Sequence, residues 1–193
     1  MAKLYFRYGA MNSGKSTGLL QAAFNYEERG QRVLLAKPGV DTKGDRDVVS
    51  RLGVTRTVDL VFAPDADVRA LVLAAGKVDC LLVDEAQFLA AGQVDDLLRL
   101  AVLDGIPVLA YGIRTDFRTE AFPGSARLME LAHTLEELKT ICRCGRKAMF
   151  NARMVDGVFV FDGSQVAIDG VDVTYESLCG NCYLAESGGR LDG

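Results

Sequence analysis

Near the start of the chain, residues 9–16 read GAMNSGKS and match the pattern G-x-x-x-x-G-K-[ST] in full. A β-prone run precedes the match and a helical pattern follows it, which is the context that this pattern requires. Glycines let backbone N–H groups curl around phosphate oxygens, and the start of a helix adds partial positive charge. Lys15 is expected to reach the β- and γ-phosphates of ATP, and Ser16 to bind Mg²⁺. The predicted nucleotide-binding residues are Gly9, Ala10, Met11, Asn12, Ser13, Gly14, Lys15 and Ser16.

An acidic pair follows an apolar run that has the character of a central parallel strand. Residues 78–83 read VDCLLV and end at Asp84 and Glu85. In folds with such a phosphate loop, an acidic residue here holds Mg²⁺, so Asp84 is expected to do so, and Gln87 is grouped with the same site. A carboxylate near the γ-phosphate can accept a proton from an attacking hydroxyl, which makes Glu85 the candidate general base. The alternative is that Glu85 is an ordinary solvated loop residue.

Two cysteine pairs stand late in the sequence, with Cys142 and Cys144 forming C-x-C and Cys179 and Cys182 forming C-x-x-C. Four thiolates at such spacing suit tetrahedral zinc, and four protein ligands leave no open position, so a structural zinc is expected. The alternative is a set of reduced thiols without metal. The fifth cysteine, Cys80, lies in an apolar run and is expected to be a small buried side chain.

The rest of the pattern alternates apolar runs with helical periodicity. Strands are expected at residues 3–8, 32–37, 78–83 and 107–111, helices at 17–29, 68–75, 93–103 and 126–138, and a long loop at 38–53. This alternation predicts an α/β fold, namely a P-loop, RecA-like domain with a mostly parallel sheet and helices on both faces. We expect that domain to cover residues 1–139, and residues 140–193 to form a small β-rich domain stapled by zinc.

The composition limits the classes of partner. Hydrophobic residues make up 49% of the 193, and 22 Lys and Arg stand against 26 Asp and Glu, a net charge of −4. A protein that grips the nucleic acid backbone usually shows a basic excess, so no nucleic-acid partner is expected. No apolar run approaches the roughly 20 residues of a membrane span, and the sequence opens without a secretory leader. We therefore expect a cytoplasmic protein without a membrane partner.

The motifs occur together in a known order. Residues 9–16, the DEAQF run at 84–88, the YGIRTDF run at 111–117 and the two cysteine pairs resemble the type II thymidine kinase family over residues 3–183. The resemblance implies an enzyme that transfers the γ-phosphate of ATP to the 5′-hydroxyl of thymidine and gives dTMP. Its cofactors would be Mg²⁺ and a structural Zn²⁺. Glu85 matches the general base of the family, and Lys15 its phosphate-binding lysine.

The resemblance also implies where thymidine would bind. Phe117 and Phe122 match aromatic positions near the thymine pocket, and Met11 and Phe88 are expected to line it. Taken alone, these aromatic residues would be read as core. Residues 165–175 fall where the family has a lasso-like loop, anchored by the zinc, that reads the nucleoside largely through its backbone. The loop residues implied to bind substrate are Val166, Ala167, Ile168, Asp169, Gly170 and Tyr175.

Some points stay open at the level of the sequence. The C-x-C pair stands where some relatives have C-x-x-C, although bacterial members resemble this form. The family uses an arginine to stabilise the transferring phosphate, and Lys43, Arg46 and Arg51 compete for that place. The resemblance further implies a homotetramer and feedback inhibition by dTTP. A different nucleoside remains an alternative, because pocket shape decides between thymidine and deoxyuridine.

Two other classes of protein share parts of the pattern. A helicase-type ATPase driven by nucleic acid could carry the DEAQ run at residues 84–87, but such enzymes need two domains of this kind and the length supplies one. A non-enzymatic zinc module that binds nucleic acid would need a basic C-terminal segment. Acidic residues outnumber basic ones over residues 140–193, which argues against it.

Overall fold

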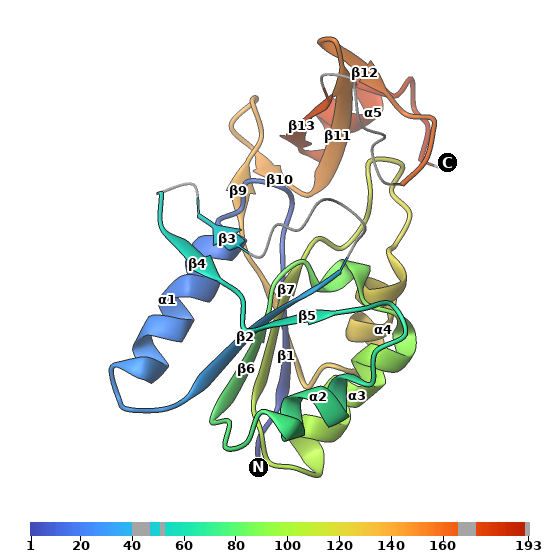
Figure 1. Cartoon of the computed structure of the whole chain (residues 1–193). Coiled ribbons are helices and arrows are strands. Elements are labelled where there is room, and N and C mark those ends of the chain that lie inside the picture. Colours follow the sequence, from blue (N-terminus) through green and yellow to red (C-terminus); the bar gives the residue numbers. More distant parts are fainter. Residues whose placement is uncertain (40–46, 51–52, 166–172, 192–193) are drawn as a thin grey trace.

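A computed structural model describes residues 1–39, 47–50, 53–165 and 173–191 of the chain. Its centre is a six-stranded sheet in the order β5-β2-β6-β7-β1-β8, and every neighbouring pair in it is parallel (Figure 1). The strands are β1 (Leu4–Tyr8), β2 (Val33–Pro38), β5 (Leu60–Phe62), β6 (Cys80–Val83), β7 (Val108–Gly112) and β8 (Thr134–Glu137).

Helices cover both faces of this sheet, as the sequence predicts (Figure 1). Helix α1 buries Leu19 and Ala23 against one face, where they pack with Leu35, Leu82 and Tyr111. The other three helices pack on the opposite face around a larger apolar core. Because both faces are covered, the two innermost strands, β6 and β7, are apolar and buried at every position rather than alternating. The helices are α1 (Lys15–Glu27), α2 (Val68–Ala74), α3 (Ala91–Val102) and α4 (Pro123–Leu131).

The order of the strands decides where the functional residues meet. Strands β6, β7 and β1 are neighbours, and their carboxyl ends lie at one edge of the sheet. The phosphate loop follows β1, the acidic pair follows β6, and Ile113 follows β7. Ligands of open parallel sheets bind at this edge. Residues far apart in the sequence are thereby brought to one place.

Two of the expected elements are wrong in part. The helix expected at residues 126–138 ends at Leu131, and the chain then forms β8 beside β1. This strand lies at the sheet edge with mostly half-exposed or exposed side chains, so it lacks the apolar run that marks a buried strand. The loop expected at 38–53 contains β3 (Asp47–Val49), which forms an antiparallel pair with β4 (Thr55–Thr57). Both are three residues long, too short to show periodicity.

The C-terminal region is β-rich, as expected, and has its own apolar core around Phe161, Leu178 and Tyr183. A three-stranded antiparallel sheet in the order β12-β11-β13 stands above the edge of the main sheet (Figure 1). A β9–β10 hairpin precedes it and a short helix follows it. The elements are β9 (Thr140–Ile141), β10 (Lys147–Ala148), β11 (Phe150–Val155), β12 (Val158–Val160), β13 (Val173–Leu178) and α5 (Gly180–Glu186).

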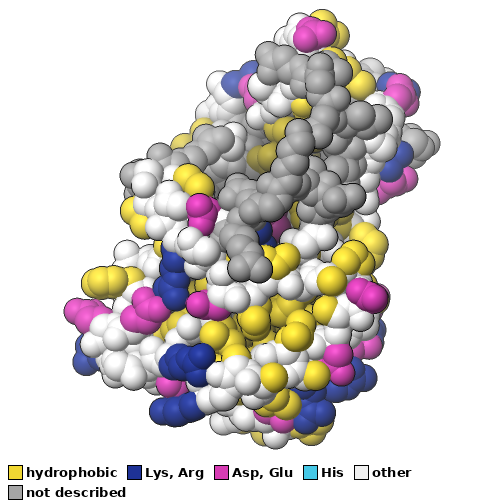
Figure 2. All heavy atoms as spheres, in the orientation of Figure 1, with side chains coloured by type: hydrophobic (Ala, Val, Ile, Leu, Met, Phe, Trp, Pro, Cys, Tyr) yellow, Lys and Arg dark blue, Asp and Glu magenta, His cyan; other side chains and the backbone are white. Residues whose placement is uncertain are grey.

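The surface is mixed in charge. On the face shown in Figure 2, Lys and Arg side chains alternate with Asp and Glu side chains, and among the coloured residues no continuous basic stripe crosses it. Within the described part of the chain, no helix is long and apolar enough to cross a membrane.

Candidate active site

The phosphate loop owes its shape to its sequence. Gly14 has φ +79°, a left-handed conformation that glycine adopts without steric cost, and α1 begins at the next residue. The N–H groups of the first turn of α1, which form the positive end of the helix dipole, therefore point toward the loop. The Lys15 ammonium lies over the same loop, 2.9 Å from the carbonyl oxygen of Ala10. This is a cradle for phosphate oxygens.

A hydroxyl and a carboxylate meet beside that cradle. Ser16 Oγ donates to Asp84 Oδ2 at 3.5 Å. Burial, with the negative charge of Glu85 next in importance, raises the pKa of Asp84 to about 6. A buried carboxylate with this pKa gains from a cation at its oxygens, and Mg²⁺ prefers oxygen ligands of this kind. The pair therefore fits a magnesium site.

We expect Asp84→Asn to stabilise the protein in the absence of magnesium and nucleotide. Between pH 4 and 6 the Asp84 carboxyl group is largely protonated in the folded protein but largely ionised in the unfolded chain. The free energy of unfolding therefore falls as the pH rises through that window, and the full loss of stability is reached above about pH 6. Asn carries no charge, so the variant should gain about 3 kcal/mol at pH 8 and much less at pH 4.

Urea denaturation at the two pH values measures this difference. The control is Asp65→Asn, which changes an exposed carboxylate and should alter the free energy of unfolding by less than about 0.5 kcal/mol at either pH. An equal gain for Asp84→Asn at pH 4 and pH 8 would show that ionisation of the Asp84 carboxyl group does not lower the free energy of unfolding. Turnover of Asp84→Asn should fall at the same time.

Glu85 is held in an unusual backbone conformation. Its φ is +50°, which costs a residue with a Cβ roughly 1 kcal/mol or more and is typical of functional sites. The fully buried Gln87 side chain fixes the carboxylate, because its amide nitrogen donates to Glu85 Oε2. The amide oxygen of Gln87 accepts from the N–H of Ile113 at 3.2 Å. At Gly112 an added Cβ would lie 2.6 Å from that oxygen, so any other residue there would displace the Gln87 amide from its hydrogen bond to Ile113.

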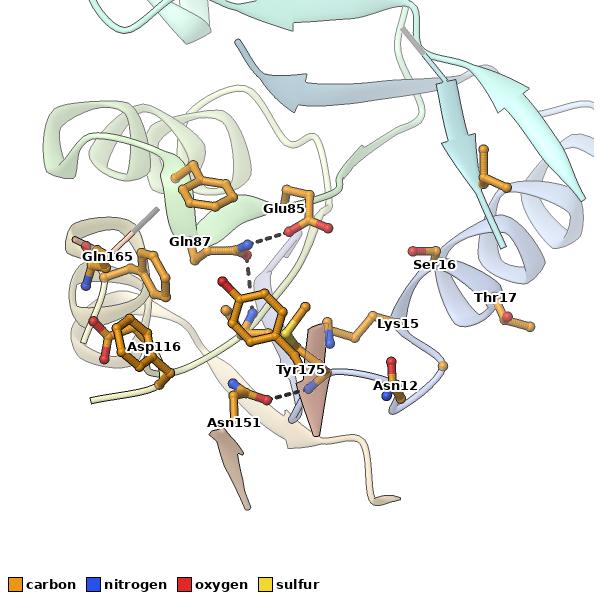
Figure 3. A pocket seen from close by; sticks show the side chains of 17 residues that line it. Asn12, Lys15, Ser16, Thr17, Glu85, Gln87, Asp116, Asn151, Gln165 and Tyr175 are labelled. Carbon is orange, nitrogen blue, oxygen red and sulfur yellow. Dashed lines mark hydrogen bonds between the residues drawn. The ribbon is translucent and has the colours of Figure 1, made fainter. Parts of the chain in front are cut away.

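A pocket of about 460 Å³ opens between the phosphate loop and the C-terminal sheet. Figure 3 shows Asn12, Lys15 and Ser16 toward one end, Asp116 and Gln165 toward the other, and Glu85 between them. The predicted site residues that line it are Met11, Asn12, Gly14, Lys15, Ser16, Glu85, Gln87, Phe88, Phe117, Phe122 and Tyr175. Gly9, Ala10, Ser13 and Asp84 belong to the same loop and strand end but do not line the pocket.

Aromatic side chains form the far end of the pocket. Phe88 and Phe122 make an edge-to-face pair with ring centroids 5.4 Å apart. Phe117 is 1% exposed and Phe122 4% exposed, so both are core residues that also line the pocket. Asp116 shapes the turn that carries Phe117, because its carboxylate accepts from the backbone N–H groups of Arg118 and Glu120. An apolar slot of this kind suits a flat ring.

The C-terminal sheet is fastened to the phosphate loop at Met11. The Met11 N–H donates to Asn151 Oδ1 at 2.7 Å, and the Ser177 hydroxyl donates to the Met11 carbonyl oxygen (Figure 3 draws the first bond). The Asn151 amide also donates to the Thr115 carbonyl at 3.1 Å. We call these contacts the Met11 clasp. They make the C-terminal sheet part of the same site.

Four cysteines gather at the end of the C-terminal region. The sulfurs of Cys142, Cys144, Cys179 and Cys182 all lie within 4.8 Å of one another. Zinc with sulfurs about 2.3 Å away in a tetrahedron places those sulfurs about 3.8 Å apart, so the cluster fits zinc. Burial acts to raise the pKa of Cys142, but hydrogen bonds from backbone N–H groups and from the Cys144 and Cys182 thiols together lower it to about 6. Hydrogen bonds with the neighbouring cysteines raise the pKa of Cys182 to about 12. Four such thiolates need a cation to ionise together.

Some predicted residues lie outside the described part of the chain. They are the loop residues Val166, Ala167, Ile168, Asp169 and Gly170 and the competing cations Lys43, Arg46 and Arg51.

Sequence reasoning gave no site role to five residues that line the pocket: Thr17, Val49, Ile113, Asp116 and Asn151. Gln165 also lines the pocket and was expected only as the first residue of the loop at 165–175. Asn151 carries no motif, and its role follows from long-range pairing that brings β11 over the loop. Asp116 stands within the YGIRTDF run, and a polar residue beside an aromatic one at a strand end is a signal that could have found it. Thr17 directly follows the phosphate motif and could have been found in the same way.

The sheet, the phosphate loop and the acidic strand end define a P-loop nucleotide-binding protein. The family model described as "Thymidine kinase" matches residues 2–183. The chain therefore belongs to the thymidine kinase family.

Individual relatives agree with that assignment. A thymidine kinase of Idiomarina loihiensis is 50% identical over 184 residues, covering 93% of this chain and 94% of that protein. A thymidine kinase of Ruegeria pomeroyi is 48% identical and one of Chromobacterium violaceum 47% identical, covering 92% and 98% of their own lengths and 93% and 95% of this chain. Among solved structures, Bacteroides Pif1 bound to ssDNA overlaps with a TM-score of 0.38 at 16% identity, covering 70% of this chain and 38% of that one. That overlap is too weak to inform function.

Proposed function

We propose that this protein transfers the γ-phosphate of ATP to the 5′-hydroxyl of thymidine. The observation that carries the proposal is the shared pocket: the phosphate loop, the Glu85 carboxylate and an apolar aromatic slot all line one cavity. A phosphate donor at the loop and a flat base in the slot would leave the sugar hydroxyl beside Glu85. The matching family model and the relatives named thymidine kinase support the choice of substrate.

The residues divide the chemical work between them. Lys15 and the N–H groups at the start of α1 place positive charge on the β- and γ-phosphates, where charge develops during transfer. Glu85 accepts the proton from the 5′-hydroxyl, held in position by Gln87. Ser16 and Asp84 are the residues that would hold Mg²⁺, which neutralises phosphate charge when bound. Positioning and electrostatics supply most of the acceleration in this account.

Phosphate donor and acceptor are tested by one comparison. ADP formation is measured with ATP and Mg²⁺ together with thymidine, deoxyuridine, deoxycytidine or deoxyguanosine, and without nucleoside. We expect strong turnover with thymidine, weaker turnover with deoxyuridine and almost none with the other two. Turnover that does not depend on any nucleoside would remove the proposal.

Further assignments belong to the same proposal. Phe88, Phe117, Phe122 and Tyr175 would bind the nucleoside together with the loop at 166–170, and the four cysteines would hold a structural Zn²⁺. A homotetramer, inhibition by dTTP, a cytoplasmic location and a domain boundary at residues 139–140 stay predictions. The grouping of Gln87 with the ATP and magnesium site also stays a prediction, since its amide contacts Glu85 and Ile113.

A further inference from the structure

Arg153 is a buried cation directly behind the aromatic end of the pocket. It lies on β11, two positions from Asn151, so both side chains leave the same face of the strand. Arg153 is only 5% exposed. Burying a guanidinium is costly unless its donors are satisfied, so a buried arginine at this place calls for a reason.

The guanidinium contacts three separate segments of the chain. Its Nε donates to the Tyr175 hydroxyl at 3.0 Å, its Nη1 to the Ser164 carbonyl at 2.8 Å, and its Nη2 to the Gln165 carbonyl at 3.0 Å. The plane also lies over the Phe117 ring, with 3.7 Å from Cζ to the ring centroid. Three of these contacted residues, Phe117, Gln165 and Tyr175, line the pocket, whereas Arg153 does not.

We propose that Arg153 is a positioning residue that sets the affinity for the nucleoside, an inference that rests on the proposed function. Its contacts hold the Phe117 ring, the Gln165 backbone and the Tyr175 hydroxyl in fixed positions relative to one another. We call these three groups the pocket wall. A preformed wall spares the ordering cost that binding would otherwise carry. Among the described residues, the phosphate loop and Glu85 make no hydrogen bond or ion pair with Arg153, so nucleotide binding and the chemical step should depend on it far less.

The arrangement requires arginine rather than a general cation. A planar guanidinium can donate in three directions within its plane and still present a face to an aromatic ring. A lysine ammonium at the same place can reach one or two of these oxygens and offers no plane to stack. Arg153→Lys therefore keeps the charge while breaking the wall.

Steady-state kinetics with separate variation of thymidine and ATP test the proposal. We expect Arg153→Lys to raise the KM for thymidine at least about 10-fold, with kcat within about 3-fold and the KM for ATP within about 2-fold of wild type. Calorimetric titration of thymidine into the full-length protein should show the same loss as a weaker Kd. Zinc content and Tm are measured on the same samples. Arg99→Lys is the matched control, since Arg99 lies on α3 and pairs with Asp96 at the surface.

A double-mutant cycle with Tyr175→Phe gives the sharper readout. If Arg153 acts through the Tyr175 hydroxyl, the combined variant should lose less thymidine affinity than the two single losses multiplied together. Should Arg153→Lys lower the Tm by more than about 10 °C, Arg153→Gln replaces it, because a neutral amide is less costly to bury.

The outcomes separate this proposal from the proposed function. A wild-type protein that does not phosphorylate thymidine overturns the function itself, whatever the variant does. Active wild type with a thymidine KM raised less than about 3-fold in the folded variant overturns the role of Arg153 alone, and so does a fall in kcat that exceeds the rise in KM.

Discussion

Glu85→Gln should lower kcat about 100-fold or more while the affinity for ATP changes by less than about 2-fold. The amide has the shape of the carboxylate but cannot accept the proton of the 5′-hydroxyl. Gln87 can still contact the new side chain, so the local backbone and the pocket should keep their shape. Single-turnover measurement of dTMP formation isolates the chemical step, and fluorescent nucleotide displacement reports on ATP binding.

Glu130→Gln serves as the control for this substitution. Glu130 lies on α4, pairs with Arg127 at the surface and does not line the pocket, so kcat should stay within about 2-fold of wild type. A Glu85→Gln variant that keeps more than about a third of the wild-type kcat would mean that another group, or water, accepts the proton.

Preventing metal binding at the four-cysteine cluster should impair nucleoside binding in the pocket. Structural zinc supplies about 10 kcal/mol or more of folding energy to small metal-bound regions, so Cys179→Ser or a strong chelator should unfold the C-terminal region. The connection to the pocket is short, because Tyr183 on α5 donates through its hydroxyl to the Phe117 carbonyl at 2.7 Å. We expect the KM for thymidine to rise at least about 100-fold and the Tm to fall by about 10 °C or more.

Three measurements check this expectation without relying on activity. Bound zinc is quantified by atomic absorption, unfolding by calorimetry, and exposure of the C-terminal region by limited proteolysis. Cys80→Ala is the matched control, because Cys80 is a buried thiol under α1, outside the cluster, and its loss should leave the zinc content unchanged. A zinc-free protein with wild-type Tm and proteolysis pattern would show that the cluster is not a structural metal site.

Four of the six strands of the central sheet, β1, β2, β6 and β7, were predictable because their signals are local, whereas β5 and β8 were not predicted. One apolar run precedes the phosphate motif, which a helical pattern follows, and a second apolar run precedes Asp84. Each of these two runs predicts a buried parallel strand. Strand β8 gave no such signal, since an edge strand with exposed side chains looks like the end of the helix before it. The short β3–β4 pair depends on pairing between residues that carry no periodicity at all.

The candidate site divides in the same way. Glu85, the phosphate loop and the cysteines were predictable because their chemistry demands particular residues at fixed spacing. Asn151 and Arg153 could not be found in this way. Each acts through contacts to segments far away in sequence, and nothing in the composition of β11 distinguishes them from other polar residues on a small strand.

The Met11 clasp also bears on the order in which the protein folds as it is made. Met11 is bonded to partners 140 and 166 positions further along the chain. The strands of the main sheet are complete by Glu137, and domains generally fold from the N-terminus during synthesis, so the sheet can assemble before either partner leaves the ribosome. The phosphate loop would then be formed but would lack the complete Met11 clasp until Ser177 emerges from the ribosome. Nucleotide binding should accordingly be one of the last properties that a growing chain acquires, and nascent chains stalled before residue 151 should hold ATP poorly.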